Sequence, residues 1–221
     1  MGRNTSIETE KNSDLIKKKL LSTSVVKKHF GINPEKILHD YLYPKFGQRY
    51  LDYRDKYENY LKDSKHKYTP NYPISVILEL VNRCDLECAM CYQGFRNDAE
   101  KSTLQLPDLE NLFEDFKKNK LDALLFSTSE PLLYKNFFKV LELATKANIM
   151  DLFLFTNGTL LNEKNSRKIL ESSVTRLFIS IDAFSNETYD KVRIPVTKNI
   201  KSNRIEQLQN NIKNFMKLRD E

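Results

Sequence analysis

The sequence has no long apolar run. None of its 221 residues lies in a stretch that approaches the roughly 18 consecutive apolar residues of a transmembrane helix. The N-terminus, Met1–Ser6, leads into a charged segment and not into the apolar stretch of a secretory signal peptide. These absences exclude membrane-spanning and secreted proteins, and we expect a cytoplasmic protein.

Cysteine and histidine are scarce, and this restricts the kinds of metal or disulfide site. The chain has three cysteines and three histidines, and the histidines His29, His39 and His66 stand far from the cysteines without ligand spacing. A structural zinc site normally has four Cys or His ligands. A disulfide framework normally has an even number of cysteines and an oxidising compartment. The composition therefore argues against both.

The chain does have enough apolar material for a core, with 40% hydrophobic and 30% charged residues. Its net charge of +6 is confined to one part: residues 1–70 contain 15 Lys and Arg against 9 Asp and Glu, whereas residues 71–221 contain 21 of each. A basic segment can contact nucleic acid or acidic lipid, but so small an excess is typical of a solvated helical surface. We therefore expect neither nucleic acid nor a membrane as a partner.

The hydrophobic pattern changes near residue 70. Residues 12–67 have a helical pattern in which Pro34 suits a first helical turn. Four tyrosines recur there at helical spacing: Tyr50, Tyr53, Tyr57 and Tyr60. We interpret them as the face of an amphipathic helix that packs on the following domain, with recognition of bases or peptides as the alternative. A turn-rich boundary at residues 68–73 predicts a helical, basic N-terminal extension over residues 1–70.

Beyond residue 70, apolar strand runs alternate with helical patterns. The predicted strands are residues 74–80, 121–126, 151–155 and 176–181. Helical patterns follow them near residues 109–116, 137–144, 163–172 and 205–215. This alternation predicts an α/β fold with four βα units, a parallel sheet and right-handed crossovers. Because such a sheet has exposed edges, we expect further chain or a partner to cover one of them.

The three cysteines lie together, directly after the first predicted strand. Cys84, Cys88 and Cys91 have the spacing Cys-x3-Cys-x2-Cys. Three thiolates on one short loop can bind three irons of a cubane iron–sulfur cluster. Because there is no fourth cysteine, the fourth iron would keep an open position for a substrate or cofactor. Three inert buried cysteines are the alternative, although such residues would not be expected to share this spacing.

This motif resembles the signature of the radical S-adenosylmethionine (SAM) superfamily, and the resemblance covers about residues 74–195. It implies a partial (βα) barrel over residues 71–221 that holds the N-terminal portion of the family's core. It also implies a [4Fe–4S] cluster on the three cysteines, with SAM on the fourth iron. One electron then cleaves SAM to a 5′-deoxyadenosyl radical, which abstracts a hydrogen from the substrate. The Cys88–Tyr92 segment is similar to the branch with a cysteine-rich, SPASM-type C-terminal extension.

The resemblance also implies SAM-binding roles for residues that follow the second and third strands. Ser127–Pro131 is similar to the family's Gly-Gly-Glu-Pro segment, in which Glu130 would hold the ammonium group of SAM. Thr128 and Ser129 replace the two glycines, which normally allow close approach of a ligand to the backbone. Asn157 belongs to a Thr-Asn-Gly sequence and would line the site. Taken alone, both segments would be ordinary turns.

Further residues of the implied site come from the fourth strand, from the helix region after it and from the cysteine loop. Ser180 would reach the carboxylate or ribose of SAM, and Asp182 would line the site or cap the following turn. Arg193 would pair with a carboxylate of SAM or substrate, with a surface ion pair as the alternative. Met90 supplies an apolar group beside the third cysteine at a place that is often aromatic.

The sequence therefore predicts a radical SAM enzyme of the oxidoreductase or transferase type, or the N-terminal part of one. The expected substrate is a peptide, a protein or a small metabolite, and the expected electron donor is a small redox protein such as flavodoxin or ferredoxin. We expect the chain to be incomplete on its own, because a C-terminal half would supply the other side of the cavity. A non-catalytic iron–sulfur-binding remnant, or a truncated protein that binds a partner, is the alternative.

Overall fold

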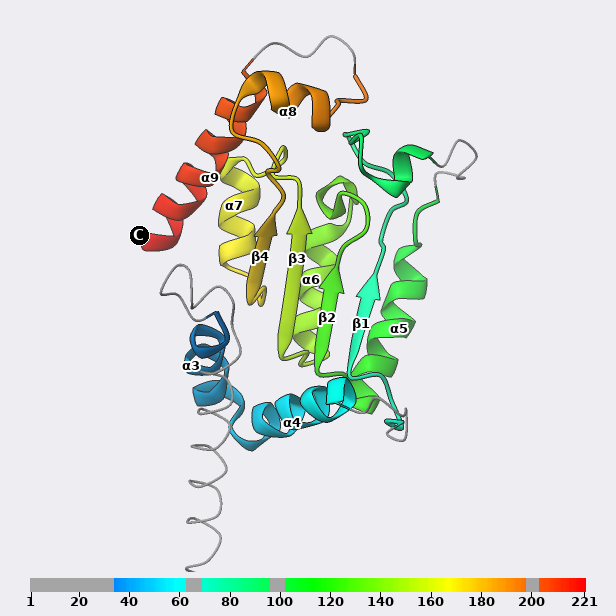
Figure 1. Cartoon of the computed structure of the whole chain (residues 1–221). Coiled ribbons are helices and arrows are strands. Elements are labelled where there is room, and N and C mark those ends of the chain that lie inside the picture. Colours follow the sequence, from blue (N-terminus) through cyan, green and yellow to red (C-terminus); the bar gives the residue numbers. More distant parts are fainter. Residues whose placement is uncertain (1–33, 63–68, 96–101, 198–202) are drawn as a thin grey trace, which may run out of the picture. The chain divides into compact units, whose positions relative to one another are not determined.

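The structure is a computed structural model that describes residues 34–62, 69–95, 102–197 and 203–221 (Figure 1). The chain divides into two compact units, Met1–Ile74 and Ser75–Glu221. The limits predicted from the sequence, residues 1–70 and 71–221, stay predictions of domain organisation. No helix within the described ranges combines the length and the apolar character that crossing a membrane requires.

Two helices form the described part of the first unit. Helix α3 (Pro34–Phe46) begins at the predicted proline, and α4 (Gln48–Lys62) follows after Gly47. Gly47 has φ +52° and its N–H donates to the carbonyl of Tyr43 at 2.8 Å, which closes α3. Tyr50, the first residue of the tyrosine stripe, is buried edge-on against His39 with ring centroids 5.5 Å apart. The predicted helical pattern before Pro34 lies outside the described residues.

The second unit contains the predicted parallel sheet. Its strands are β1 (Ser75–Leu78), β2 (Ala123–Phe126), β3 (Asp151–Thr156) and β4 (Arg176–Ile179). The strands are hydrogen-bonded in the order β1-β2-β3-β4, and every neighbouring pair is parallel. The four strands fall where the sequence predicts them, although β1 and β4 are shorter because their last residues turn toward the loops above the sheet.

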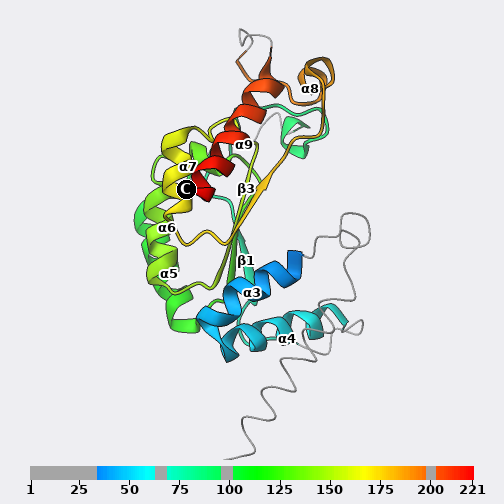
Figure 2. The same ribbon diagram turned by 90° about the vertical axis from the view of Figure 1, so that its left-hand side faces the viewer.

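Helices connect the strands and cover one face of the sheet. Helices α5 (Leu106–Asn119), α6 (Phe137–Lys146) and α7 (Glu163–Leu170) lie on the same side in Figure 2. Two more helices follow β4: α8 (Asn186–Val192) and α9 (Arg204–Asp220), of which α9 packs on both α7 and α8. A sequential strand order with its helices on one face is the arrangement of a (βα) barrel, so the predicted partial barrel is confirmed.

The sequence pattern explains which face of the sheet the helices cover. Strand residues alternate between the two faces of a sheet. Phe126 and Leu154 are neighbours on one face and are buried. Apolar residues of the helices, such as Phe113 and Leu141, are buried as well. The opposite face includes Ile77 and Phe178, which are 62% and 42% exposed. Helices α5, α6 and α7 all lie on the other face, so this apolar face corresponds to the inner side of a barrel.

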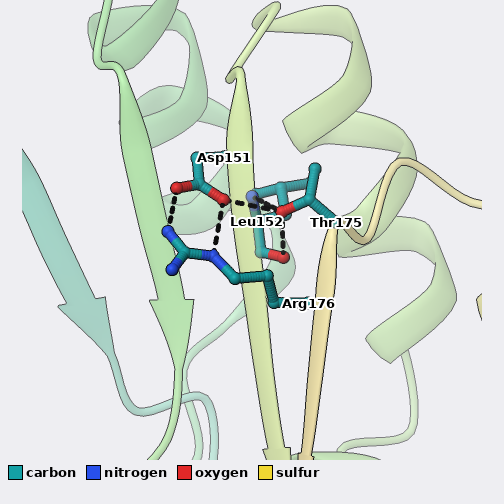
Figure 3. Close-up of polar contacts among 4 residues, drawn as sticks. All are labelled: Asp151, Leu152, Thr175 and Arg176. Atoms are coloured by element: carbon teal, nitrogen blue, oxygen red, sulfur yellow. Dashed lines mark hydrogen bonds and ion pairs between the residues drawn. The ribbon is translucent and has the colours of Figure 1, made fainter. Parts of the chain in front are cut away.

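Polar groups cross-link the end of the sheet at which the strands begin (Figure 3). Asp151, the first residue of β3, is fully buried. Its carboxylate accepts hydrogen bonds from Thr175 Oγ1 at 2.7 Å and Arg176 Nε at 3.1 Å, and it also pairs with Arg176 Nη2. The Arg176 guanidinium in turn lies over the ring of Phe153, 3.4 Å from its centroid. This network joins the starts of β3 and β4.

Replacing Asp151 with alanine should destabilise the second unit by about 3 kcal/mol, because it leaves the partly buried guanidinium of Arg176 without its counter-charge. Urea unfolding of the whole chain measures this as a lower transition midpoint. The control is Glu142→Gln, which breaks the exposed ion pair with Lys139 and should leave the midpoint unchanged. Equal effects of the two changes would show that the Asp151 network contributes no more than a surface pair.

Candidate functional site

The site lies at the ends of the strands, where their last residues and the following loops surround a cavity of about 410 Å³. In Figure 1 the cysteine loop and the loops after β2, β3 and β4 all stand above the arrowheads. The cavity is lined by all nine residues singled out in the sequence: Cys84, Cys88, Met90, Cys91, Glu130, Asn157, Ser180, Asp182 and Arg193. Residues up to 109 positions apart in the sequence, from five different loops, therefore share one cavity.

The loop that carries the cysteines is fixed by the chain segment after α8. The N–H of Glu87 donates to the carbonyl of Ile194 at 2.7 Å, and the N–H of Ala89 donates to the carbonyl of Val192 at 2.9 Å. The N–H of Val196 donates back to the carbonyl of Asp85 at 3.0 Å. This pairing holds the cysteine loop along a segment that is more than a hundred residues later in the sequence.

The side chain of Asp85 ties the same loop to the end of β3. Its Oδ1 accepts a hydrogen bond from Asn157 Nδ2 at 2.7 Å, and its Oδ2 accepts one from Thr159 Oγ1 at 2.6 Å. The Asn157 amide also approaches Cys84 Sγ at 3.6 Å. Asn157 lines the cavity, and these contacts place its amide beside the first cysteine; its role toward SAM stays a prediction.

The three cysteines are free thiols, and for two of them, Cys84 and Cys88, the environment raises the pKa and so opposes ionisation. Burial raises the pKa of the Cys84 thiol to about 12, and the carboxylates of Asp85 and Glu130 act in the same direction. Burial also raises the pKa of Cys88, although the guanidinium of Arg193 acts against this. Thiolates form in such a place when a bound cation compensates their charge. The donor set, three thiols on one loop facing a cavity, therefore fits an iron–sulfur cluster.

A site for a single metal ion is not formed in the same place. Within the described ranges, no group of three or more His, Cys, Asp or Glu side chains is arranged to hold one metal ion. His39, the one histidine within these ranges, belongs to the first unit.

Glu130 lies beneath the cavity, and its carboxylate is engaged within the protein. It is 1% exposed and accepts hydrogen bonds from the N–H of Leu132 at 3.1 Å, from the N–H of Asn157 at 2.8 Å and from Thr156 Oγ1 at 2.9 Å. Burial raises the pKa of Glu130 to about 7, although these donors act in the opposite direction. The carboxylate thus joins the loop after β2 to the end of β3.

Of the two residues that replace the family's glycines, Thr128 retains a glycine-like backbone conformation. Thr128 has φ +85°, a conformation that β-branched residues rarely adopt. Its Oγ1 donates to the carbonyl of Ser127 at 2.5 Å. The hydroxyl of Ser129 donates to Glu79 Oε1 at 2.6 Å and accepts from Gln93 Nε2 at 2.7 Å. Both hydroxyls therefore make contacts within the protein at the cavity wall.

The remaining predicted residues occupy the wall formed by β4 and the segment after α8. The N–H of Ser180 donates to the carbonyl of Thr156 at 3.0 Å, which places Ser180 beside the end of β3. Asp182 has φ +56° and pairs with Arg193. Arg193 also donates to Cys88 Sγ at 3.4 Å. The ion pair considered for Arg193 is therefore present, but it lies in the cavity wall.

Several functional residues are missing from the sequence prediction. Asp85 and Thr159 form a hydrogen bond that ties the cysteine loop to the loop after β3. Glu79 and Gln93 are both hydrogen-bonded to Ser129. Asp85 carries a usable signal, because a carboxylate between two cysteines needs hydrogen-bond donors once the loop is buried. Asn157 and Thr159 also have the spacing of an Asx turn, in which Asn157 Oδ1 accepts from the N–H of Thr159 at 2.9 Å.

The pKa of Glu130 predicts how stability depends on pH in the protein without cofactors. The folded state binds the proton of the Glu130 carboxyl group more tightly than the unfolded state does. The stabilisation of the folded state by this proton is therefore complete below about pH 4.5 and is lost as the pH rises through about 7. The expected loss between these limits is about 3 kcal/mol. Urea unfolding at pH 5 and pH 8 should show it in the unaltered chain and not in Glu130→Gln. An equal pH dependence in both proteins would contradict this.

The backbone of Thr128 predicts a stabilising substitution. Thr128→Gly removes the Cβ from a positive-φ position and should raise the free energy of unfolding by about 1 kcal/mol. Thr128→Ala removes the hydroxyl and methyl groups but keeps the Cβ, so it should bring no gain. Thermal unfolding of the two variants separates these effects, and a gain with alanine equal to that with glycine would refute the role of backbone strain.

Comparison with known proteins gives one matching family and several solved structures with a similar fold. The family model of the Radical SAM superfamily matches residues 78–219. No curated protein matches the chain. Solved structures with a similar fold include Streptococcus suis SuiB bound to precursor peptide SuiA, with 16% identity and a TM-score of 0.54 over 77% of this chain and 35% of that one.

A second similar structure is native anSMEcpe with bound AdoMet, which has 22% identity and a TM-score of 0.54 over 66% of this chain and 41% of that one. The chain thus spans well under half the length of these two structures. At such identities the likeness concerns the fold. The family model, however, covers more than half of the chain and includes the cysteine loop, strands β2, β3 and β4 and the residues that line the cavity. The chain therefore belongs to the radical SAM superfamily.

Proposed function

We propose that this chain is the cluster-binding part of a radical SAM enzyme. In this proposal Cys84, Cys88 and Cys91 hold a [4Fe–4S] cluster, and SAM occupies the rest of the cavity. The observation that carries the proposal is the convergence of three free thiols with polar side chains from the ends of β2, β3 and β4 on one cavity. The chemistry that a cluster supplies when bound is one-electron cleavage of SAM, which yields the radical that removes a hydrogen from a substrate.

The protein's own residues would position the two cofactors. Asp85 and the segment after α8 keep the cysteine loop in place. Ser180 and Asn157 offer polar groups to the ribose or carboxylate of SAM, and Met90 offers an apolar contact at the cavity. Glu130 supplies negative charge beneath the place where the ammonium group would lie. A cation there would lower the pKa of this buried carboxyl group.

The substrate and partners follow from the resemblance to one branch of the family. We infer a peptide, a protein or a small metabolite as substrate, in a branch with a SPASM-type extension, and one similar fold, SuiB, is bound to a precursor peptide. A flavodoxin or ferredoxin in the cytoplasm would supply the electron. Further chain or a partner would cover the exposed inner face of the sheet, since Ile77 and Phe178 need a cover in a working barrel.

Two observations favour the alternative, an iron–sulfur-binding protein without turnover. Both oxygens of Glu130 already accept hydrogen bonds from the protein, and Thr128 brings a Cβ to a wall where the family has glycine. Each feature weakens the contacts expected for the methionine part of SAM. A chain of this kind would bind a cluster and release no 5′-deoxyadenosine.

Anaerobic reconstitution with iron and sulfide tests the proposal. The whole chain should bind about four irons and four sulfides and become coloured, and addition of SAM should change the electron paramagnetic resonance spectrum of the reduced cluster. Cys84→Ala should lose the cluster, whereas Ser173→Ala, away from the cavity, should keep it. About one zinc per chain and no colour would refute the proposal.

The second stage separates catalysis from binding. Dithionite and SAM are added to the reconstituted chain, and 5′-deoxyadenosine is measured by chromatography. Release of 5′-deoxyadenosine that depends on Cys84 supports the enzyme, with slow turnover expected while the other side of the cavity is uncovered. A stable cluster that responds to SAM without any release would support the non-catalytic alternative.

A further inference from the structure

Arg193 makes an unusual contact with one of the three cysteines. It follows α8, and its Nη1 donates to Cys88 Sγ at 3.4 Å. Cys84 Sγ, in contrast, is approached by the neutral amide of Asn157 at 3.6 Å. One thiol of the site thus has a positive charge at hydrogen-bond distance, and another has a neutral donor.

The guanidinium is held in this position from several sides. Its Nη2 pairs with Asp182, and only 12% of the Arg193 side chain is exposed. Its backbone N–H donates to the carbonyl of Tyr189 at 2.7 Å, and its carbonyl accepts from Arg204 Nη2 at 2.5 Å. The residues on both sides of Arg193 pair with the cysteine loop through the carbonyls of Val192 and Ile194. Cys88 and Arg193 therefore belong to one rigid pair of segments.

A fixed positive charge beside a cluster sulfur has a definite electrostatic effect. Reduction adds one electron to the cluster, and no bond forms or breaks in that step. The reduced cluster is more negative, so a cation and an N–H donor at a ligating sulfur stabilise it relative to the oxidised cluster and raise the reduction potential. Asp182 acts in the opposite direction from a greater distance, because Arg193 lies between it and the sulfur.

We propose that Arg193 is a positioning residue that raises the reduction potential of the cluster through its contact with Cys88. The inference rests on the proposed function, since it requires a cluster on the three cysteines. It differs from the expectation that Arg193 binds a carboxylate of SAM, because the contact with Cys88 is made by the protein alone. Arg193 would thereby ease electron transfer from a low-potential one-electron donor.

The test is a redox titration of the reconstituted whole chain without SAM, followed by electron paramagnetic resonance. Omitting SAM removes any effect of its carboxylate. Arg193→Gln should reduce the equilibrium constant for one-electron reduction at least tenfold, which is a fall of about 59 mV in the reduction potential.

Two further variants serve as controls. Arg193→Lys keeps the charge and should recover part of this loss in potential. Lys191→Gln removes a cation two residues earlier, in α8, but that side chain is exposed and pairs with Glu187, so the potential should stay unchanged.

A second comparison covers the case in which Arg193→Gln does not assemble a cluster because Asp182 is left unpaired. Asp182→Asn is tolerated at the positive φ of this position, and Asp182→Asn/Arg193→Gln removes both charges of the pair. The double variant should have a lower potential than Asp182→Asn alone.

The outcomes separate the two proposals. Equal potentials with and without Arg193, in either background, would overturn the role of Arg193 and leave the proposed function standing. Failure of the unaltered chain to form a cluster would overturn the proposed function, and the inference would fall with it. A fall in potential with Lys191→Gln as large as that with Arg193→Gln would show a general charge effect and would also overturn the role of Arg193.

Discussion

The carboxylate of Asp85 is the contact on which the arrangement of the site depends. The cysteine loop has few apolar anchors, of which Leu86 is one, so its position relative to the sheet is set by polar contacts. Asp85 binds Asn157 and Thr159 through separate oxygens at 2.7 and 2.6 Å. Both partners come from the loop after β3. The cysteines of a loop after β1 are therefore placed by residues that follow β3, and the thiols face the cavity as a consequence.

That loop after β3 is itself supported from two sides. Beneath it, Glu130 accepts the N–H of Asn157 and the hydroxyl of Thr156. On its outer side, α9 packs against Gly158, which has φ +77°. A Cβ at Gly158 would lie 2.5 Å from Leu208 Cδ1, so only glycine allows this approach. Asn211 of α9 also donates to the carbonyl of Gly158 at 3.0 Å. The last helix therefore contributes to the site without lining it.

The sheet was predictable from the sequence because its strands are apolar runs bounded by turns, and the order of βα units allows few topologies. That nine residues from distant segments would share one cavity was predictable because cysteine spacing and short segments at strand ends resemble a known family, while the role of each residue stays a prediction. The role of Asp85 was missed, since a carboxylate between two cysteines needs hydrogen-bond donors only where the loop is buried, and the residues around it do not show that burial. The engagement of Glu130 and the positive φ of Thr128 depend on the packing of β2 against β3, which no local pattern contains. Helix α8, with seven residues, is too short to show a helical period.

The cavity concentrates groups whose environment is unfavourable while it is empty. Burial raises the pKa of Cys84 to about 12 and that of Glu130 to about 7, so it disfavours their ionised forms, and Thr128 holds a strained backbone conformation beside them. Positive charge in the cavity would lower both pKa values, because it favours the ionised forms of a thiol and of a carboxyl group. In the proposed function iron provides that charge near Cys84, and the ammonium group of SAM provides it near Glu130. Ligands that bind only the folded chain stabilise it, so the stability of this unit and the filling of its cavity would rise together.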